Sequence, residues 1–361
     1  MLEGRDTLTG LTIAAETCYP ATVGSSRVRV LGMRKELAAR GIDLEYLPSL
    51  TGPEYRVVTS SAPSVVKALT LSRAAARLAR RRVPPPALRL VHRLRFPISL
   101  PVRDPVRDLD VYDFDDALPV GTVGSANGRF MWLKREAQQS IGYLRSARLV
   151  IAGTPYLADL ASDHARRIEV VPSCVDPASQ PTREHEDVDI VTVGWIGSRS
   201  TTPHLEEKLE VFERLVAEGV PLRLVAVGAE TSFRASWFTA RPWSLEREPQ
   251  DLAAFDIGIM PMPDGPWTRG KCGYKAVQYF AAGLPVVASP VGVAHTLVVP
   301  DRGRLARDSS EWAAAIRELV GDAGARREMG ANGRRLVEKQ YSYARWAPEV
   351  STLLLSLAGA C

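Results

Sequence analysis

Basic side chains gather in the stretch Ile257 to Gly292, at the point where a loop turns into a helix. Around them the pattern predicts an apolar strand, a long loop, a helix, a second apolar strand and a glycine-rich turn. The basic residues are Arg269, Lys271 and Lys275. A helix N-terminus offers unpaired N–H groups and a partial positive charge, so this arrangement favours a phosphate ligand. A solvated loop with incidental lysines fits equally well on motif shape alone.

Carboxylates end another predicted strand, Leu109 to Ala117 (LDVYDFDDA). Asp113, Asp115 and Asp116 have an Asp-x-Asp spacing that can hold a metal ion, but the motif is short and common. Capping of the turn that follows is an alternative role for Asp115 and Asp116. We predict no metal site.

Small polar residues follow the first predicted strand, Leu11 to Ala15. Gly24, Ser25 and Ser26 lie where the strand ends and a helix begins, which is the crevice where α/β folds bind ligands. The segment lacks the GxGxxG spacing of dinucleotide sites. Arg27 and Arg29 either face this crevice or decorate the helix, and we favour decoration.

Composition describes an ordinary globular chain. Its 361 residues suffice for two domains, 45% are hydrophobic, and the net charge of +5 decides no partner by itself. We find no zinc-finger spacing and no RNA-binding signature, so nucleic acid is not expected. The four cysteines are scattered, and neither a secretory signal nor a membrane-spanning run is apparent, so we expect a cytoplasmic protein.

The elements alternate between strand and helix along the chain, which predicts mainly parallel sheets. The alternation lapses in the polar stretch from Cys174 to Asp189. We therefore predict an N-terminal Rossmann-like domain (1–176), a C-terminal Rossmann-like domain (177–344), and a final helix (345–361) that packs on the first domain. Ligands of such folds bind at the carboxyl ends of strands, which predicts a cleft between the domains.

Residues 64–95 are rich in Ala, Leu and Arg, and Pro84–Pro86 divide them into two predicted basic helices. A solvated helix face above an apolar core is the favoured interpretation. Docking to an anionic membrane or a lipid-linked substrate is the alternative.

Three segments resemble the glycosyltransferase group 1 family (family 4), which has the GT-B fold. They are GWIGSRSTTPHLE, the block from DLAAFDIGIM to VVASPVGV, and GRRLVEKQYSYARWAP. The resemblance is strongest over about 188–348; before that, ETCYPATVGSSRVRV, VYDFDDA and VVPSCVDP follow in the expected order. It implies transfer of a sugar from a nucleotide donor, with retention of anomeric configuration and without a metal or other cofactor.

The family's site residues are only partly present. Its two donor-binding glutamates fall at Gly270 and Gln278, and its basic pair falls at Ser198 and Pro203. The resemblance then implies that Lys271 and Lys275 neutralise the diphosphate, with Arg199 as a further candidate. Asp115 takes the position of a histidine that many members have, which makes it a candidate for contacting the reacting sugar or acceptor. The remaining donor-binding candidates are Gly197, Asp264, Cys272, Gly273 and Tyr274, and the loop Gly24–Ser26 faces phosphate or acceptor.

The expected protein is a glycosyltransferase with a nucleotide-sugar donor and a small-molecule or peptide acceptor, of the kind used in natural product or glycan biosynthesis. Two alternatives stay open. One is a membrane-associated transferase with a lipid-linked or polysaccharide acceptor, and the other is a non-catalytic nucleotide-sugar-binding protein. Peripheral membrane contact is not favoured, and the sequence does not indicate an oligomeric state.

Overall fold

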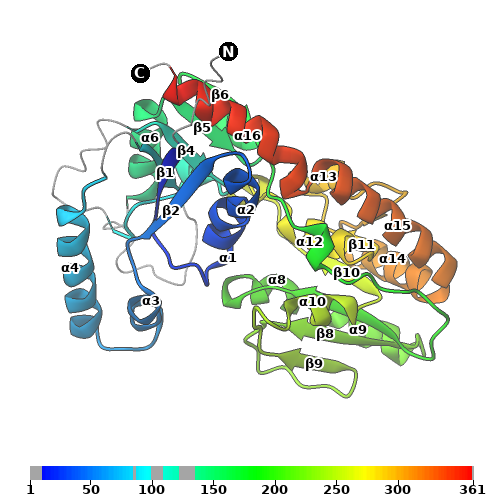
Figure 1. Ribbon diagram of the computed structural model, residues 1–361. Helices are drawn as coiled ribbons and strands as arrows, with labels where there is room; N and C mark the ends of the chain where they lie inside the picture. The colour runs from blue at the N-terminus through cyan, green and yellow to red at the C-terminus, as the bar shows by residue number, and fades with distance from the viewer. Residues whose placement is uncertain (1–9, 84–86, 99–108, 122–134, 360–361) are drawn as a thin grey trace, which may run out of the picture. The chain divides into compact units, whose positions relative to one another are not determined.

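The computed structural model describes residues 10–83, 87–98, 109–121 and 135–359. They form two α/β units, each built on one six-stranded sheet whose paired strands all run parallel (Figure 1). The first unit comprises Met1–Ser173 with Trp346–Cys361, and the second comprises Cys174–Arg345. The divisions predicted from the sequence were 176/177 and 344/345.

The first sheet has the strand order β2-β1-β3-β4-β5-β6. Its strands are β1 (Leu11–Thr17), β2 (Ile42–Pro48), β3 (Leu88–His92), β4 (Val111–Phe114), β5 (Leu149–Ala152) and β6 (Ile168–Val170). The chain passes from β1 to one neighbour and then crosses to β3 on the other side. The order therefore reverses between β1 and β3, and such a reversal is the point where open α/β sheets bind ligands.

Helices connect these strands. They are α1 (Gly24–Ser26), a π-helical turn (Arg27–Leu31), α2 (Arg34–Ala38), α3 (Gly52–Thr59), α4 (Ser64–Arg80), a 3₁₀ turn (Leu118–Val120), α6 (Glu136–Ser146), α7 (Pro155–Ala161) and, at the C-terminus, α16 (Tyr343–Ala358). Val350, Leu354 and Leu357 of α16 are buried, and Arg148 donates a hydrogen bond to the carbonyl of Leu357. The last helix thus packs within the first unit.

The second of the two basic helices predicted within residues 64–95 is wrong. Residues 88–92 form β3, an inner strand of the sheet between β1 and β4. The prediction failed because Arg89 and His92 interrupt the apolar pattern; inside the protein their side chains pair with Glu16 and Asp113. The first basic helix is present as α4. The break at Pro84–Pro86, part of the helix predicted over 130–147, and Cys361 lie outside the described residues.

The second sheet has the order β12-β11-β10-β7-β8-β9. Its strands are β7 (Val191–Ile196), β8 (Leu222–Val227), β9 (Phe238–Arg241), β10 (Ile257–Met260), β11 (Val286–Ala288) and β12 (Gly303–Leu305). The order reverses between β7 and β10. The loops that leave these two neighbouring strands therefore meet at the carboxyl edge of the sheet.

The sequence pattern predicts two helices in the second unit at about 309–320 and 323–340, and the structure has α14 (Ser309–Gly321) and α15 (Ala323–Gln340) there. Asp308 and Asp322 cap them by accepting hydrogen bonds from first-turn N–H groups. The others are α8 (Thr202–Glu206), α9 (Leu209–Ala217), α10 (Glu248–Ala253), α11 (Pro266–Arg269), α12 (Tyr274–Ala281) and α13 (Ala294–Leu297), with 3₁₀ turns at Pro177–Ser179 and Arg199–Thr201.

None of the described helices has the length and apolar composition needed to span a bilayer.

Candidate active site

Helix α12 lies over the reversal point of the second sheet and is held there by Tyr279. The pairing of β7 with β10 covers only two residue pairs, Val193 with Ile257 and Gly194 with Gly258. Beyond them, the Ile196 N–H donates to the Tyr279 hydroxyl (2.9 Å), which donates to the Ile259 carbonyl (3.1 Å). The buried phenol, whose pKa burial raises, thus joins the ends of both strands.

Lys275 lies one turn before Tyr279 on the same face of α12. Its ammonium is 4.5 Å from the ring centroid of Trp195, a fully buried residue of β7. The ammonium also donates a hydrogen bond of 3.3 Å to the hydroxyl of Thr201, in the loop that follows β7. This contact joins the two predicted phosphate-binding segments, the loop after β7 and the start of α12.

The charge of Lys275 has no acidic partner among the interactions the structure gives it. Burial, together with the nearby ammonium of Lys271, lowers the pKa of Lys275 to about 7. Lys271 lies 5.1 Å from the centroid of the Trp267 ring. Two cations supported by indole faces are suited to binding a ligand with two negative charges.

His204 of α8 faces the same cations, although sequence reasoning missed it. Burial lowers its pKa, and the charges of Lys275 and Lys271 lower it further against the opposing effect of Glu207. Its Nδ1 is buried and has no hydrogen-bond partner within the described residues. Trp195, Thr201 and Trp267 were missed as well, because a tryptophan in an apolar strand and a threonine in a loop look structural.

Glycines shape the loops around the lysines. Gly273 begins α12 with φ +65°, and a Cβ there would come within 2.7 Å of Leu297 and Val293. A Cβ on Gly197 would lie 2.3 Å from the Trp195 ring and 2.8 Å from the Thr201 hydroxyl. Gly197 therefore allows the backbone to lie against Trp195 and Thr201, which position Lys275, and Gly273 allows α12 to begin close to Val293 and Leu297.

Other predicted donor-site residues are engaged in local contacts. Arg269 and Asp264 form a two-pronged ion pair (2.7 and 2.8 Å) on the surface, and that pair lowers the pKa of Asp264. Arg199 lies 3.5 Å from Glu230. The Lys271 backbone N–H donates to the Thr268 carbonyl at the end of α11.

The remaining candidates cluster around α12. Gln278 is buried on α12, one turn after Tyr274, and Gly270 ends α11. Cys272 is buried between the two helices. Ser198 follows Gly197 after β7, where its N–H donates to the Thr201 hydroxyl (3.1 Å) and its own hydroxyl is 3.0 Å from that of Ser200.

In the first unit, the predicted acids lie near the end of β4, Asp113 within the strand and the other two after it, and they are paired with basic groups. Asp113 is buried between Arg29 (2.5 Å) and Nδ1 of His92 (2.7 Å). Burial would raise the pKa of Asp113, but Arg29 and His92 hold it below its usual range. The expectation that Arg29 decorates a helix surface is wrong, because this ion pair keeps its side chain 3% exposed.

Arg93, whose backbone φ is +60°, lies 2.7 Å from Asp116 and 3.7 Å from Asp115. Burial alone would lower the pKa of Arg93, but the two carboxylates raise it. Among the described residues, no group of three or more His, Cys, Asp or Glu side chains is arranged to hold a metal.

Gly24, Ser25 and Ser26 form α1, after the end of β1 and at the reversal point of the first sheet. The Ser26 hydroxyl is buried and donates to the Tyr19 carbonyl (3.3 Å). Gly24 has open space where a Cβ would stand. The nearby His92, at the end of β3, was not predicted; its Nε2 is buried without a hydrogen-bond partner in the described part of the chain.

Comparison with known proteins gives a family for part of the chain. Residues 187–322 match the family model described as "Glycosyl transferases group 1". No curated protein matches the sequence.

Solved structures of similar fold include sucrose-phosphate synthase from Thermosynechococcus elongatus, with a TM-score of 0.69 at 17% identity over 97% of this chain and 100% of that one. WaaG, a glycosyltransferase of lipopolysaccharide biosynthesis, gives 0.64 at 15% identity over 95% and 99%. HepE from Anabaena, solved with UDP and glucose, gives 0.64 at 13% identity over 96% and 100%. At these identities the similarity concerns the fold, and the predicted GT-B fold is confirmed.

Proposed function

We propose, from the match of residues 187–322 to the group 1 glycosyltransferases, that this chain transfers a sugar from a nucleoside-diphosphate sugar to an acceptor. The family match supports the glycosyltransferase predicted from the sequence. The observation that carries the site assignment is the pair Lys271 and Lys275, held by Trp267 and Trp195 beside the reversal point of the second sheet.

The donor diphosphate binds these two lysines in our proposal. Negative charge grows on the leaving phosphate as the sugar–phosphate bond breaks, so cations fixed at that place stabilise the transition state more than the ground state. The ammonium of Lys275 is already aimed at the loop after β7 by Thr201. The first turn of α12 adds its N–H groups and the positive end of its dipole.

The nucleoside and sugar ends of the donor are assigned to residues around α12. Gln278 binds the ribose diol through its amide, without the charge assistance of a glutamate. Gly270, Cys272, Gly273 and Tyr274 line the sugar side by their place between α11 and α12. Asp264 can contact the donor sugar only if its ion pair with Arg269 is replaced by a hydrogen bond from a sugar hydroxyl.

Residues of the first unit bind the acceptor, a small molecule or peptide, in the same proposal. Asp115 and the Gly24–Ser26 loop are assigned this role, Asp115 with Arg93 nearby and the loop at the reversal point of its sheet. Transfer with retention and without a metal follows from the family resemblance. A cytoplasmic location is part of the same proposal and is supported by the scattered cysteines of the sequence, which form no CxxC pair.

The test is calorimetric binding of UDP, GDP, ADP, CDP and dTDP to the intact protein, followed by sugar-transfer assays with the corresponding donors. We expect one diphosphate to bind and to raise the melting temperature. Lys271→Ala and Lys275→Ala should each weaken binding at least about tenfold and slow transfer by roughly 10²- to 10³-fold.

Lys208→Ala is the matched control, because Lys208 also lies over an indole ring, that of Trp312, at 5.7 Å. Its binding and turnover should stay at wild-type values. Equal effects of all three substitutions would reject the assignment of Lys271 and Lys275. Tight diphosphate binding without transfer to any acceptor would instead support a non-catalytic nucleotide-sugar-binding protein.

A further inference from the structure

Helix α4 leaves an apolar stripe uncovered on its outer face. Leu71, Ala74 and Leu78 pack inward, in a cluster with Leu50 and Phe96. On the opposite side, Val65 is 69% and Leu69 56% exposed. Two exposed large side chains four residues apart form a continuous patch at the beginning of the helix. In Figure 1, α4 lies at the margin of its unit, beside α3.

Positive charge accompanies this stripe. Residues 51–82, which contain α3 and α4, carry seven basic residues and one acid, Glu54. The rest of the chain has 39 basic and 40 acidic residues, so this segment accounts for the net positive charge of the protein. The excess of basic residues in this segment is therefore a local feature and does not reflect the general composition of the chain.

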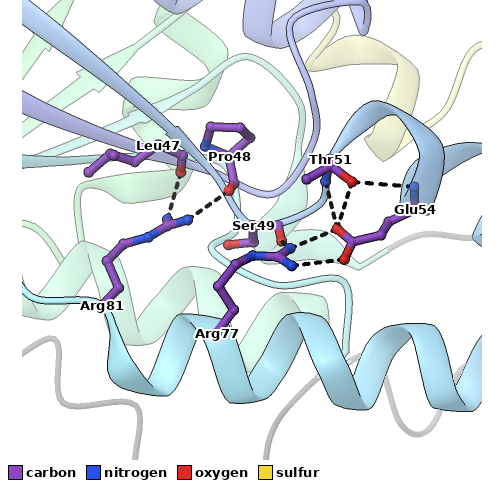
Figure 2. A network of polar contacts seen from close by, with 7 residues as sticks. All are labelled: Leu47, Pro48, Ser49, Thr51, Glu54, Arg77 and Arg81. Atoms are coloured by element: carbon purple, nitrogen blue, oxygen red, sulfur yellow. Dashed lines mark hydrogen bonds and ion pairs between the residues drawn. The ribbon is translucent and has the colours of Figure 1, made fainter.

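Two arginines of α4 and the residue after it, Arg77 and Arg81, are engaged in hydrogen bonds within the protein (Figure 2). Arg77 holds Glu54 through both guanidinium nitrogens (2.9 and 2.7 Å) and also donates to the Ser49 carbonyl. Arg81 donates to the carbonyls of Leu47 and Pro48. The one acid is thus neutralised.

Arg73 and Arg80 are seven residues apart on α4 and are exposed. Because they lie on the same side of the helix as Leu69, they flank the apolar stripe.

We propose that α4 docks the protein on an anionic lipid surface, with Val65 and Leu69 entering the interface and Arg73 and Arg80 contacting lipid phosphates. An interfacial helix needs an apolar face for burial and basic residues for attraction to anionic lipids, and α4 supplies both. Charge complementarity selects this occupant. A second copy of this chain that met this face symmetrically would place arginines opposite arginines, because Glu54, the one acid of residues 51–82, is paired with Arg77.

Sedimentation with vesicles tests the proposal on the full-length protein. We expect binding to vesicles of 70% phosphatidylcholine and 30% phosphatidylglycerol, little binding to pure phosphatidylcholine, and release at high salt. Arg73→Gln with Arg80→Gln should weaken binding about 10- to 30-fold, because each basic residue near the surface contributes about a fivefold factor. Val65→Ser with Leu69→Ser should weaken it at least about tenfold.

Two double variants serve as controls. Ile190→Ser with Leu245→Ser removes apolar side chains that are similarly exposed outside α4, and Arg247→Gln with Arg307→Gln removes similarly exposed arginines. Both should bind vesicles as the wild type does. Nucleoside-diphosphate binding in solution should be unchanged in every α4 variant, so failure here is distinct from failure of the proposed function.

Several results would overturn the proposal. They are absence of wild-type binding to the anionic vesicles, equal binding by the Val65→Ser/Leu69→Ser variant, or loss of binding in the controls. Self-association that this variant abolishes, without vesicle binding, would assign the surface to a second copy instead. Salt-sensitive binding to nucleic acid that survives loss of the apolar stripe would likewise reject a lipid surface.

Discussion

At the scale of single residues, the surroundings of Lys275 determine its protonation state and so give the most specific prediction. It lies over Trp195, with Lys271 and His204 as the titratable groups that face it from the adjoining loop and from α8. Because burial lowers the pKa of Lys275 to about 7, only about half of the molecules carry a charged Lys275 at neutral pH. A bound diphosphate favours the charged form, so Lys275 takes up a proton when the ligand binds. Donor binding therefore depends on pH through this residue.

We expect the affinity for the nucleoside diphosphate to fall as pH rises above about 7, approaching tenfold per pH unit, because the empty site then loses its proton. In Lys275→Arg the guanidinium stays charged and the profile should flatten between pH 7 and 9. Calorimetry in buffers of different ionisation enthalpy measures the proton uptake directly. A wild-type profile that is flat over this range would show that Lys275 is charged in the empty site.

The basic residues of the site could be predicted from the sequence, but the residues that surround them in the fold could not. Lys271 and Lys275 stand out because they follow a strand and begin a helix. Trp195 could not be distinguished from a core residue, since its partner on α12 is 80 positions away. Arg29 was misjudged for a similar reason: its acceptor, Asp113, is brought beside it only by the tertiary fold.

At the scale of elements, a polar network joins α3 to α4 beside the apolar packing of Tyr55 (Figure 2). Thr51 and Glu54 form a capping box at the start of α3, and Arg77 of α4 forms an ion pair with the Glu54 carboxylate. The hydrogen bond from Arg77 lowers the pKa of Glu54 to about 2. This group therefore stabilises the fold above its unfolded pKa, and the contribution is lost as pH falls toward 2.

Arg77→Met, which keeps an apolar stem, should reduce the free energy of unfolding by about 1 kcal/mol at neutral pH. The difference from wild type should shrink between pH 4.5 and 2, as Glu54 takes up a proton. Denaturant titrations followed by circular dichroism measure it. Arg40→Met is the matched control, since Arg40 and Glu36 form a local, half-buried ion pair at the end of α2 that joins no second helix; an equally large loss there would contradict a special role for the network.

Element prediction was most accurate where caps and periodicity agree. Helices α14 and α15 agree with the ranges of about 309–320 and 323–340 predicted for them, and in the structure aspartate caps fix where both begin. Strand β9 was not predicted at all, because three of its four residues are exposed and it pairs only with β8 at the sheet edge. The π-helical turn at Arg27–Leu31 has no sequence signal that distinguishes it from an α-helix.

For the whole molecule, the boundary between the two units falls inside α16, after Arg345. The part of α16 that belongs to the first unit buries Val350, Leu354 and Leu357 there. Arg148, which also pairs with Asp110, donates to the carbonyl of Leu357. Residues far apart in sequence are thereby joined in one core.

Ending the chain after Arg345 should destabilise the first unit by roughly 5 kcal/mol, from the lost burial of these apolar side chains. Hydrogen exchange should rise in β4 and β5 and stay unchanged in β7 and β10. Leu355→Ser changes an exposed residue of the same helix and should leave exchange at wild-type rates. Faster exchange in β7 and β10 of the shortened chain would show that α16 stabilises more than the first unit.

The placement of a lysine ammonium over Trp195 has an optical consequence. Indole emission responds to a charge held close to the ring, and this ring is buried with its Nε1 unpaired among the described residues. Removal or displacement of the charge on Lys275 therefore changes the fluorescence of Trp195. The site contains its own reporter of occupancy, and a dye need not be attached to follow ligand binding in real time.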